Sequence, residues 1–526
     1  MQYLKRPDRH AGMDIDKPTL EASTHRRTQR GWMSLLLLVG CGFLYLETFI
    51  LPGVPRAATG DETIYLHQGE RMFEGEMIYR DYDHFTFPGT DVLYMVLFKL
   101  FGVRAWIPQA MLVVVGLGMF WLSIGISSKL LGGGLVFLPG FLFLTFPYTA
   151  YLDATHHWYS ALAAAGALAV LLEERTGIRL VWAGVLWGIA TCFAQSMVCG
   201  VLGFATFLLW ERYRTKETWR TLFRKEVFLF SGYLGVVVGF VSYFVWKAGL
   251  RQFLYYTLTF VVKFYPADQA NTWRSYMAEW PSIHTRANWP DLLAWPLIHL
   301  LVPLVYILFF VRYRREAPSQ PQEPWERLML VNITGLSLFL TVASAPTWNR
   351  LYTVSLPALI LLVWFLKFSF PVERVLLRGL WTSAVVLALM KPIVTQMRWK
   401  AYLDLPTGRT AFSKPAFYEE AAWLAARTRP GDYFFGDQGF SFALRLRNPA
   451  RVEFVRPTDY TRPEEVQNVL QALEEHKVEF VSWYPGVDDP PDPDRDHLGP
   501  LRRYLHAHYV VATTFASGYT IWERRK

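Results

Sequence analysis

The sequence predicts a polytopic α-helical membrane protein of about eleven transmembrane helices, with a small α/β domain at its carboxyl end. The first reason is composition: 52% of the residues are hydrophobic and 16% are aromatic, which is too apolar for a soluble chain whose charges collect in blocks. The second reason is that apolar stretches of spanning length recur up to about residue 398. The third is that only strand-length apolar stretches follow.

The amino-terminal segment predicts the orientation of the first helix. Residues 1–31 are polar and basic, and residues 32–51 supply the roughly 20 apolar residues that a spanning helix needs. No small-residue cleavage site follows, so this stretch is predicted to be an anchor and not a cleaved signal. Because basic residues stay on the cytoplasmic side, the tail is expected inside and the loop 52–105 outside.

Ten further stretches are predicted to span the membrane. They lie at about 106–127, 134–150, 156–173, 178–194, 196–211, 227–246, 290–311, 326–344, 351–367 and 377–396. Residues 90–102 are too short and too charged to span, so an amphipathic helix at the membrane interface is expected there. An odd total of eleven spans places the carboxyl end outside.

The basic residues agree with this order of helices. They lie in alternate connections, whereas the turns near residues 151 and 195 have none; the positions are Lys129, Arg175, Arg179, Arg212, Arg214, Lys216, Arg220, Arg224, Lys225, Arg312, Arg314, Arg315, Arg327, Lys367, Arg374 and Arg378. By the positive-inside rule these connections are cytoplasmic. We therefore expect a multi-pass protein of a bacterial cytoplasmic (inner) membrane, with its amino terminus inside.

Residues 399–526 have the composition of an extracytoplasmic α/β domain. Strand-length apolar runs at 432–436, 451–455, 478–483 and 509–515 alternate with stretches whose apolar residues recur at helical spacing. Within this domain the run Gly436-Asp437-Gln438-Gly439 has two interpretations: a contact with substrate, or a strand-to-helix turn. Its turn-forming residue types favour the turn.

The charge distribution argues against a nucleic-acid partner. The formal net charge is +9, but the basic residues form short clusters between apolar runs, as cytoplasmic loops do. The three cysteines, Cys41, Cys192 and Cys199, lie in apolar segments, so no disulfide framework is expected.

The polar segment 59–89 is the best candidate for a site of chemistry. It holds the adjacent acids Asp61 and Glu62 and, further on, Asp81, Asp83 and His84. Carboxylates at a membrane boundary are costly to bury, so such a cluster usually faces a polar cavity and handles a proton, a cation or a hydroxyl.

These acids also have structural interpretations. Asp61 or Glu62 would cap a helix that begins near residue 63, because acids at a helix start accept hydrogen bonds from free backbone N–H groups. The acids Asp81 and Asp83 would instead hold the loop together through Arg71 or Arg80.

The run from Gly60 to Gly89, GDETIYLHQGERMFEGEMIYRDYDHFTFPG, resembles the first outer loop of the GT-C membrane glycosyltransferases, the superfamily of the aminoarabinose transferase and the protein O-mannosyltransferases (glycosyltransferase family 39-like). The matching residues are an acidic pair after the first membrane helix, followed by Tyr79, Arg80, Asp81, His84, Pro88 and Gly89. The resemblance implies a GT-C-like domain over residues 32–398. It also implies transfer of a sugar from a polyprenyl-phosphate carrier to an acceptor at the outer face of the membrane.

The resemblance further implies that Asp61 is the catalytic base, with Glu62 beside it. In one respect the chain departs from the family, because Phe87 stands where the aminoarabinose transferase carries a lysine. Binding of the donor phosphate must then rest on other cations. The run WNRLYTVSLPALILL resembles a late helix of the family whose arginine lies near the donor phosphate, which implies substrate-binding roles for Arg350 and Tyr352. Snorkelling of a lone interfacial arginine is the alternative.

The other substrate-binding candidates are Asp81, His84, His156, His157 and Lys263. The two adjacent histidines lie in an outer turn, and because neighbours on a helix do not share a face they make a poor metal pair; plain hydrogen bonding is the alternative. Lys263 lies in the outer loop 247–290, whose aromatic start predicts an interfacial helix that guides a lipid tail.

We expect an inverting glycosyltransferase that needs a base and some cations and requires no cofactor. Whether it uses a divalent metal stays open. Its partners would be a polyprenyl-phosphate sugar donor, a lipid, glycan or protein acceptor, and membrane lipids. A transporter or lipid-linked sugar flippase is the main alternative, but it would need acids within its spans, and the predicted spans are nearly free of them. A non-catalytic scaffold is a second alternative, which leaves the acids near Asp61 unexplained.

Overall fold

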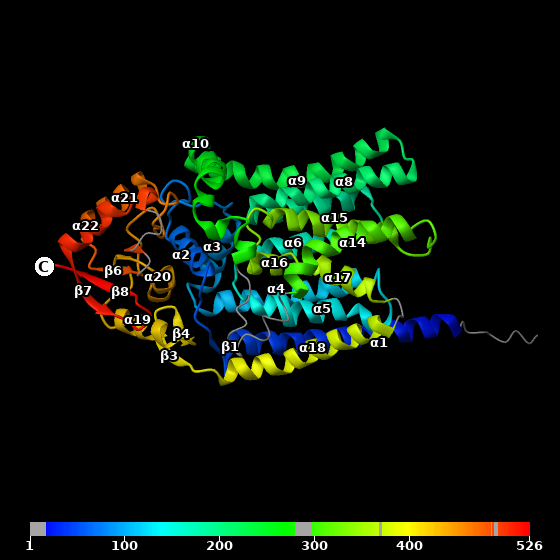
Figure 1. The fold of residues 1–526 in the computed structure, drawn as a ribbon, viewed down its shortest axis with the longest axis horizontal. Coiled ribbons are helices and arrows are strands. Elements are labelled where there is room, and N and C mark those ends of the chain that lie inside the picture. The colour runs from blue at the N-terminus through cyan, green and yellow to red at the C-terminus, as the bar shows by residue number, and fades with distance from the viewer. Residues whose placement is uncertain (1–16, 279–295, 368–370, 485–486, 489–492) are drawn as a thin grey trace, which may run out of the picture.

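The computed structural model describes residues 17–278, 296–367, 371–484, 487–488 and 493–526. Long helices lie side by side along the longest axis of the molecule, and strands with shorter helices cover one end of them (Figure 1). The carboxyl terminus lies in this smaller part, which we call the α/β unit (residues 401–526).

The helical part follows the predicted apolar stretches. Its longer helices are α1 (Lys17–Thr48), α4 (Trp106–Ser127), α6 (His156–Leu171), α7 (Gly177–Phe193), α8 (Val198–Thr215), α9 (Trp219–Ala248), α14 (Leu301–Glu316), α15 (Trp325–Val342) and α18 (Pro371–Met397). By length and composition, five described helical stretches are able to cross a membrane: 106–127, 219–248, 297–316, 325–342 and 371–397. The chain is therefore an integral membrane protein, while the total of eleven spans stays a prediction.

Two of the predicted spans are interrupted helices. The stretch 134–150 consists of a 3-10 turn η1 (Gly133–Val136), α5 (Leu138–Phe143) and a π-helix η2 (Leu144–Tyr148), and the stretch 351–367 is divided into α16 (Trp348–Thr353) and α17 (Leu356–Phe365). Prolines explain both, because Pro147 lies inside η2 and Pro357 in the first turn of α17, where a missing N–H prevents a regular helix from continuing. Of the predicted span 290–311, residues 290–295 lie outside the described part.

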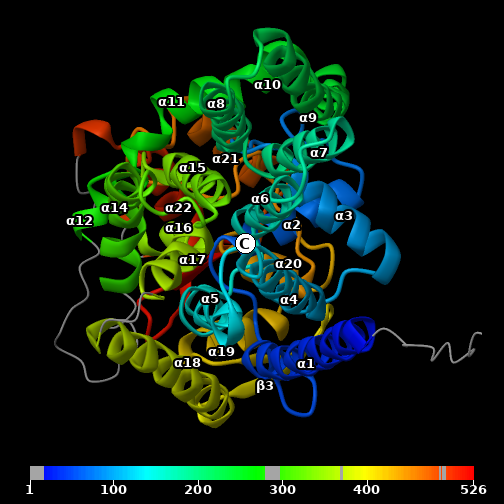
Figure 2. The same cartoon turned by 90° about the vertical axis from the view of Figure 1, so that its right-hand side faces the viewer.

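The helices form a bundle when seen from the end opposite the α/β unit (Figure 2). Helices α1 and α18 pack together along one edge, and α7, α8 and α9 lie at the opposite edge. Small residues permit the close approach of α7 and α9. A Cβ on Gly184 would lie 2.0 Å from the carbonyl oxygen of Leu229, and one on Gly232 would lie 2.1 Å from that of Val181.

Residues 52–105, which are predicted to lie outside and which we call the first outer loop, form two helices between the bundle and the α/β unit (Figure 1). They are α2 (Glu62–Phe73) and α3 (Gly89–Phe101), and α3 occupies the stretch predicted as an interfacial helix. The loop after α9, which is predicted to lie outside, continues as α10 (Leu250–Leu254), a π-helix η4 (Tyr255–Phe260) and α11 (Val261–Lys263). Residues 279–290 of that loop lie outside the described part.

The α/β unit contains two sheets. Strands β3 (Ala401–Leu405) and β4 (Gly408–Phe412) form an antiparallel hairpin, and the other sheet has the order β5 (Phe434–Phe435), β6 (Phe480–Trp483), β8 (Thr520–Arg524) and β7 (Tyr509–Thr514). Only β5 and β6 pair in parallel within these described strands. The helices are α19 (Pro415–Ala425), α20 (Gln438–Leu444), α21 (Pro463–Glu475) and α22 (Gly499–His508). Their apolar side chains form cores within this unit.

The prediction of a strand at 451–455 is wrong, because this segment has no regular secondary structure. Its backbone groups bond to other partners: the carbonyl of Arg451 accepts a hydrogen bond from the backbone N–H of Asp83, and the carbonyl of Glu453 accepts one from the side-chain amide of Gln438. The segment therefore joins the α/β unit to the first outer loop.

Candidate active site between the bundle and the α/β unit

Two cavities meet at the amino-terminal end of α2. The larger has a volume of about 470 Å³ and lies among the first outer loop, the start of α6, the segment 256–271, α16 and the α/β unit. The smaller, of about 370 Å³, lies between residues 57–64 and the α/β unit. The described residues that line both are Asp61, Ile64, Glu453, Phe454 and Arg456.

Asp61 lies at the junction of the cavities and does not cap the helix that follows it. Its side chain makes no capping hydrogen bond. The first backbone N–H of α2, that of Glu62, instead donates to Asp153 Oδ1 at 2.8 Å, and Tyr151 donates its hydroxyl proton to the other oxygen of Asp153 at 2.7 Å. An acid from a distant turn thus supplies the cap and leaves the Asp61 carboxylate in the cavity.

The environment of Asp61 favours proton transfer. The side chain keeps an accessible surface inside the cavities, but the surrounding protein removes most of its hydration, which raises the pKa of the carboxyl above its ordinary value. The positive charges of Arg350 and Arg456 oppose this rise. A carboxyl with a raised pKa is a stronger base once ionised than an ordinary aspartate.

Glu62 points away from both cavities and is only 1% exposed. Its carboxylate accepts hydrogen bonds from the backbone N–H groups of Thr59 at 3.1 Å and Ala154 at 2.9 Å. Burial raises the pKa of Glu62 to about 7, and these two hydrogen bonds oppose the rise. Through these two hydrogen bonds, Glu62 links the start of α2 to the turn before α6.

Arg350 lines the larger cavity and is held from three sides. Its guanidinium donates to the carbonyl oxygen of Ala345 at 3.1 Å, to the hydroxyl of Tyr265 at 2.7 Å and to the amide oxygen of Asn271 at 3.2 Å. These three acceptors are neutral. They orient the guanidinium, but none of them is a carboxylate that would neutralise its positive charge.

The histidines His84, His156 and His157 line the same cavity. His156 and His157 are adjacent in the first turn of α6, and both line this cavity with their ring centroids 3.9 Å apart. His156 Nδ1 is 2.6 Å from the hydroxyl of Tyr65, and His84 is hydrogen-bonded to Thr86.

Besides Glu62, three further predicted site residues lie outside the lining of both cavities. Asp81 accepts two hydrogen bonds from Arg80 and one from the backbone N–H of Met77, so it stabilises its own loop. Tyr352 is 3% exposed, and Lys263 places its ammonium over the ring of Phe264.

Asp83 does line the larger cavity, but its structural partner is not Arg71 or Arg80. It is 3.0 Å from a guanidinium nitrogen of Arg451, a residue of the α/β unit. The sequence did not reveal this pair because the two residues are far apart along the chain.

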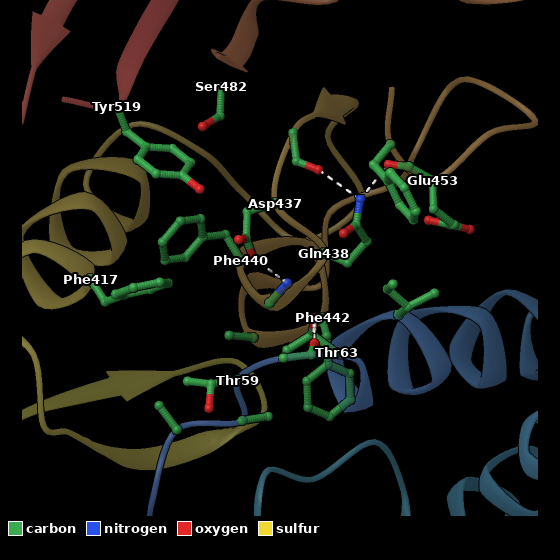
Figure 3. Close-up of a pocket in the computed structure, with 18 of the residues that line it drawn as sticks. Thr59, Thr63, Phe417, Asp437, Gln438, Phe440, Phe442, Glu453, Ser482 and Tyr519 are labelled. Atoms are coloured by element: carbon green, nitrogen blue, oxygen red, sulfur yellow. Dashed lines mark hydrogen bonds between the residues drawn. The ribbon is translucent and has the colours of Figure 1, made fainter. Parts of the chain in front are cut away.

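The smaller cavity is lined by aromatic and polar side chains of the α/β unit. Figure 3 shows Phe417, Phe440 and Tyr519 among its lining residues, together with Asp437 and Gln438. Asp437 precedes α20 and accepts a hydrogen bond from the backbone N–H of Gly439 at 2.7 Å. The run 436–439 is therefore a strand-to-helix turn that also lines a cavity.

Within the part of the chain that the structure describes, no group of three or more His, Cys, Asp or Glu side chains is arranged to hold a metal ion.

The sequence of the chain matches no protein-family model and no curated protein. Its structure is similar to two structures of ArnT from Cupriavidus metallidurans, one bound to undecaprenyl phosphate and one in the apo state. The TM-scores are 0.62 and 0.59 at 13% and 14% identity, over 94% of this chain and 98% of ArnT in both.

A third similar structure is the oligosaccharyltransferase of Archaeoglobus fulgidus tethered to an acceptor peptide, with a TM-score of 0.51 at 9% identity over 94% of this chain and 74% of that one. These likenesses show that the chain shares the helical membrane fold of ArnT and of this oligosaccharyltransferase.

Proposed function

We propose that this protein is an inverting glycosyltransferase, which moves a sugar from a polyprenyl-phosphate donor to a hydroxyl of an acceptor at the outer face of the membrane. The observation that carries the proposal is the position of Asp61, whose carboxylate lies at the junction of two cavities and makes no capping hydrogen bond to α2. The likeness to ArnT, a structure with undecaprenyl phosphate bound, supports the same conclusion.

The larger cavity suits the lipid-linked donor. Arg350 offers its positive charge to the phosphate, since charge-assisted hydrogen bonds to phosphate are the strong ones. Leu258 lines this cavity and is 58% exposed, and on the same helical segment Leu254 and Val262 are 43% and 71% exposed. This apolar surface beside the cavity suits the polyprenyl tail.

The smaller cavity suits the acceptor. Aromatic faces next to Asp437, Gln438 and Ser482 offer both apolar contact and hydrogen bonds (Figure 3), which a hydroxyl-bearing lipid, glycan or protein would use. An acceptor in this cavity reaches Asp61 from the side opposite the donor.

The proposed reaction is a single displacement at the anomeric carbon. The acceptor hydroxyl gives its proton to Asp61 while its oxygen forms the new bond to that carbon. The bond between this carbon and the phosphate oxygen breaks, and its electron pair stays on the phosphate. One displacement inverts the configuration. The step needs only a base and cations, so we propose that no metal takes part; activity retained in a chelator supports this, and activity lost contradicts it.

An amide substitution at Asp61 tests the function. Asp61 makes no capping hydrogen bond, and an amide accepts no proton, so Asp61→Asn is expected to fold and insert normally yet to lower transfer by about 10²- to 10⁴-fold. The measurement is the release of polyprenyl phosphate from polyprenyl-phosphate sugars by purified protein, with a panel of acceptors.

Glu62→Gln is the matched comparison. The two backbone hydrogen bonds end on different oxygens of Glu62, and an amide offers only one acceptor oxygen, so this variant is expected to lose some stability but much less activity than Asp61→Asn. Normal turnover in Asp61→Asn would move the base elsewhere. Movement of the lipid-linked sugar across the membrane without any transfer would replace the transferase by a transporter.

A further inference from the structure

We propose that Arg456 of the α/β unit is the second cation that binds the donor phosphate, opposite Arg350. This inference rests on the proposed function and gives it a residue that neither the resemblance nor the sequence motifs assign. The α/β unit would then complete the donor site and not merely cover it.

The chemistry of the donor calls for a second cation. A sugar-linked polyprenyl phosphate is a diester with one negative charge, and its product is a monoester of about −1.5 to −2 at pH 7. Negative charge therefore grows on the phosphate as the bond to the sugar breaks. Cations that are already in place stabilise such charge best, because they pay no reorganisation during the step.

The other cations considered in these loops do not meet this need. Arg71 is buried and paired with both Glu76 and Glu453, and Arg80 and Lys263 do not line either cavity. Phe87 stands at the position of the family's lysine.

Arg350 and Arg456 are the two Lys or Arg residues among the described lining of the larger cavity. They reach it from different parts of the fold, Arg350 from α16 and Arg456 from the segment before α21. The charges of both act on the carboxyl of Asp61, so a phosphate between them would lie beside the base.

Arg456 is available for a ligand. Its side chain remains 45% exposed, and its ionic partner is a distant one, since Nε is 3.7 Å from Asp268 Oδ2. By contrast, the nearby Arg462 is 6% exposed and held tightly by Glu465. A phosphate oxygen would replace a weak contact and not a strong one.

The segment that carries Arg456 is fixed to the helix that follows Asp61. Glu453 accepts a hydrogen bond from His67 Nδ1 at 2.8 Å and one from Arg71 at 3.0 Å, and both donors belong to α2. The backbone N–H of Arg456 itself donates to the hydroxyl of Thr461 at 2.7 Å. These buried contacts fix the positions of Arg456 and Asp61 relative to each other, as a preorganised site requires.

Substitution of Arg456 tests the inference with undecaprenyl phosphate as the probe. We expect Arg456→Gln to bind it about 10- to 100-fold more weakly than the wild type, the loss that follows removal of a charge-assisted hydrogen bond. Arg456→Lys keeps the charge and should lose less. Binding is followed by tryptophan fluorescence of purified protein, and melting temperatures show that the variants are folded.

Arg427→Gln is the matched control, because Arg427 is an exposed arginine of the same unit that lines neither cavity. Affinity equal to wild type in Arg456→Gln, or an equal loss in Arg427→Gln, would overturn the inference. So would normal donor affinity with a raised KM for the acceptor, which would assign Arg456 to the acceptor. A wild-type protein that binds undecaprenyl phosphate but never transfers a sugar refutes the proposed function alone.

Discussion

Asp61 and Glu62 are adjacent in sequence but have opposite environments. The carboxylate of Glu62 is used by two backbone N–H groups, and the cap of α2 is supplied by Asp153, so neither task falls to Asp61. A carboxylate that is free of structural duties, beside two arginines, is able to change its protonation state without disturbing the fold.

The pH dependence of the reaction follows from the raised pKa of Asp61. A general base works only when ionised, so kcat/KM should fall as the pH drops through this pKa, at a pH above the ordinary aspartate value of 3.8. The charge of Arg350 lowers the pKa, hence Arg350→Gln should move the acid limb to higher pH. The measurement is the pH profile of kcat/KM for both proteins; an acid limb that moves to lower pH in the variant contradicts this assignment.

For single residues, the sequence predicted the cavity residues of the helical part but not those that the α/β unit contributes. Asp61, His84, His156, His157 and Arg350 come from motifs or polar turns, and the structure brings them to one cavity. Arg456 gave no signal, because an arginine before a proline in a short apolar run is common in any α/β domain. Its position depends on the buried contacts of Glu453, which pair residues far apart in the sequence.

At the scale of helices, the close contact of α7 and α9 depends on glycine. A Cβ on Gly232 would lie 2.1 Å from the carbonyl oxygen of Val181, whereas one on Gly235 of the same helix meets nothing within 4 Å. We therefore expect Gly232→Ala to lower the free energy of unfolding by about 1–3 kcal/mol through overpacking. Gly235→Ala should be neutral or slightly stabilising, because alanine favours helix.

Thermal unfolding of both variants in detergent, followed by tryptophan fluorescence, measures this difference. Equal melting temperatures would mean that α7 and α9 are not packed through these glycines.

Helices were predictable because apolar length is a strong signal, and each described predicted span is helical. The prolines that interrupt two of them, Pro147 and Pro357, are visible in the sequence, but a prediction from apolar length does not take them into account. The strand predicted at 451–455 failed for a different reason. Its alternating pattern suits a strand, but its backbone bonds to partners both in the first outer loop and in the α/β unit, and such tertiary contacts override local preference.

On the scale of the whole molecule, the α/β unit is attached to the first outer loop by charged contacts. Arg445 binds Glu70 at 2.8 Å, Arg451 binds Asp83 at 3.0 Å, and Glu453 binds His67 and Arg71. The helix that begins after Asp61 is thus held by the unit that also lines the smaller cavity. A change in the position of this unit would alter both cavities at once.

The orientation of the chain in the membrane is the last prediction. Connections predicted to be cytoplasmic contact one another in the structure: Lys129 is 2.6 Å from Glu173, and Arg175 binds both Glu211 and Glu326. The contacting residues lie after α4, between α6 and α7, near the end of α8 and at the start of α15, and the turn between α8 and α9 lies at the end of the bundle opposite the α/β unit (Figure 1). Because the positive-inside rule places them in the cytoplasm, the α/β unit and the cavities should face outward.

Single cysteines in a background without Cys41, Cys192 and Cys199 test this orientation. In intact cells, a membrane-impermeant maleimide should label a cysteine at Arg427 in the α/β unit, whereas one at Arg220 in the first turn of α9 should be labelled only after lysis. Both positions are exposed in the structure, so burial does not confound the comparison. The reverse pattern would put the cavities in the cytoplasm, where the donor would have to present its sugar on the other face of the membrane.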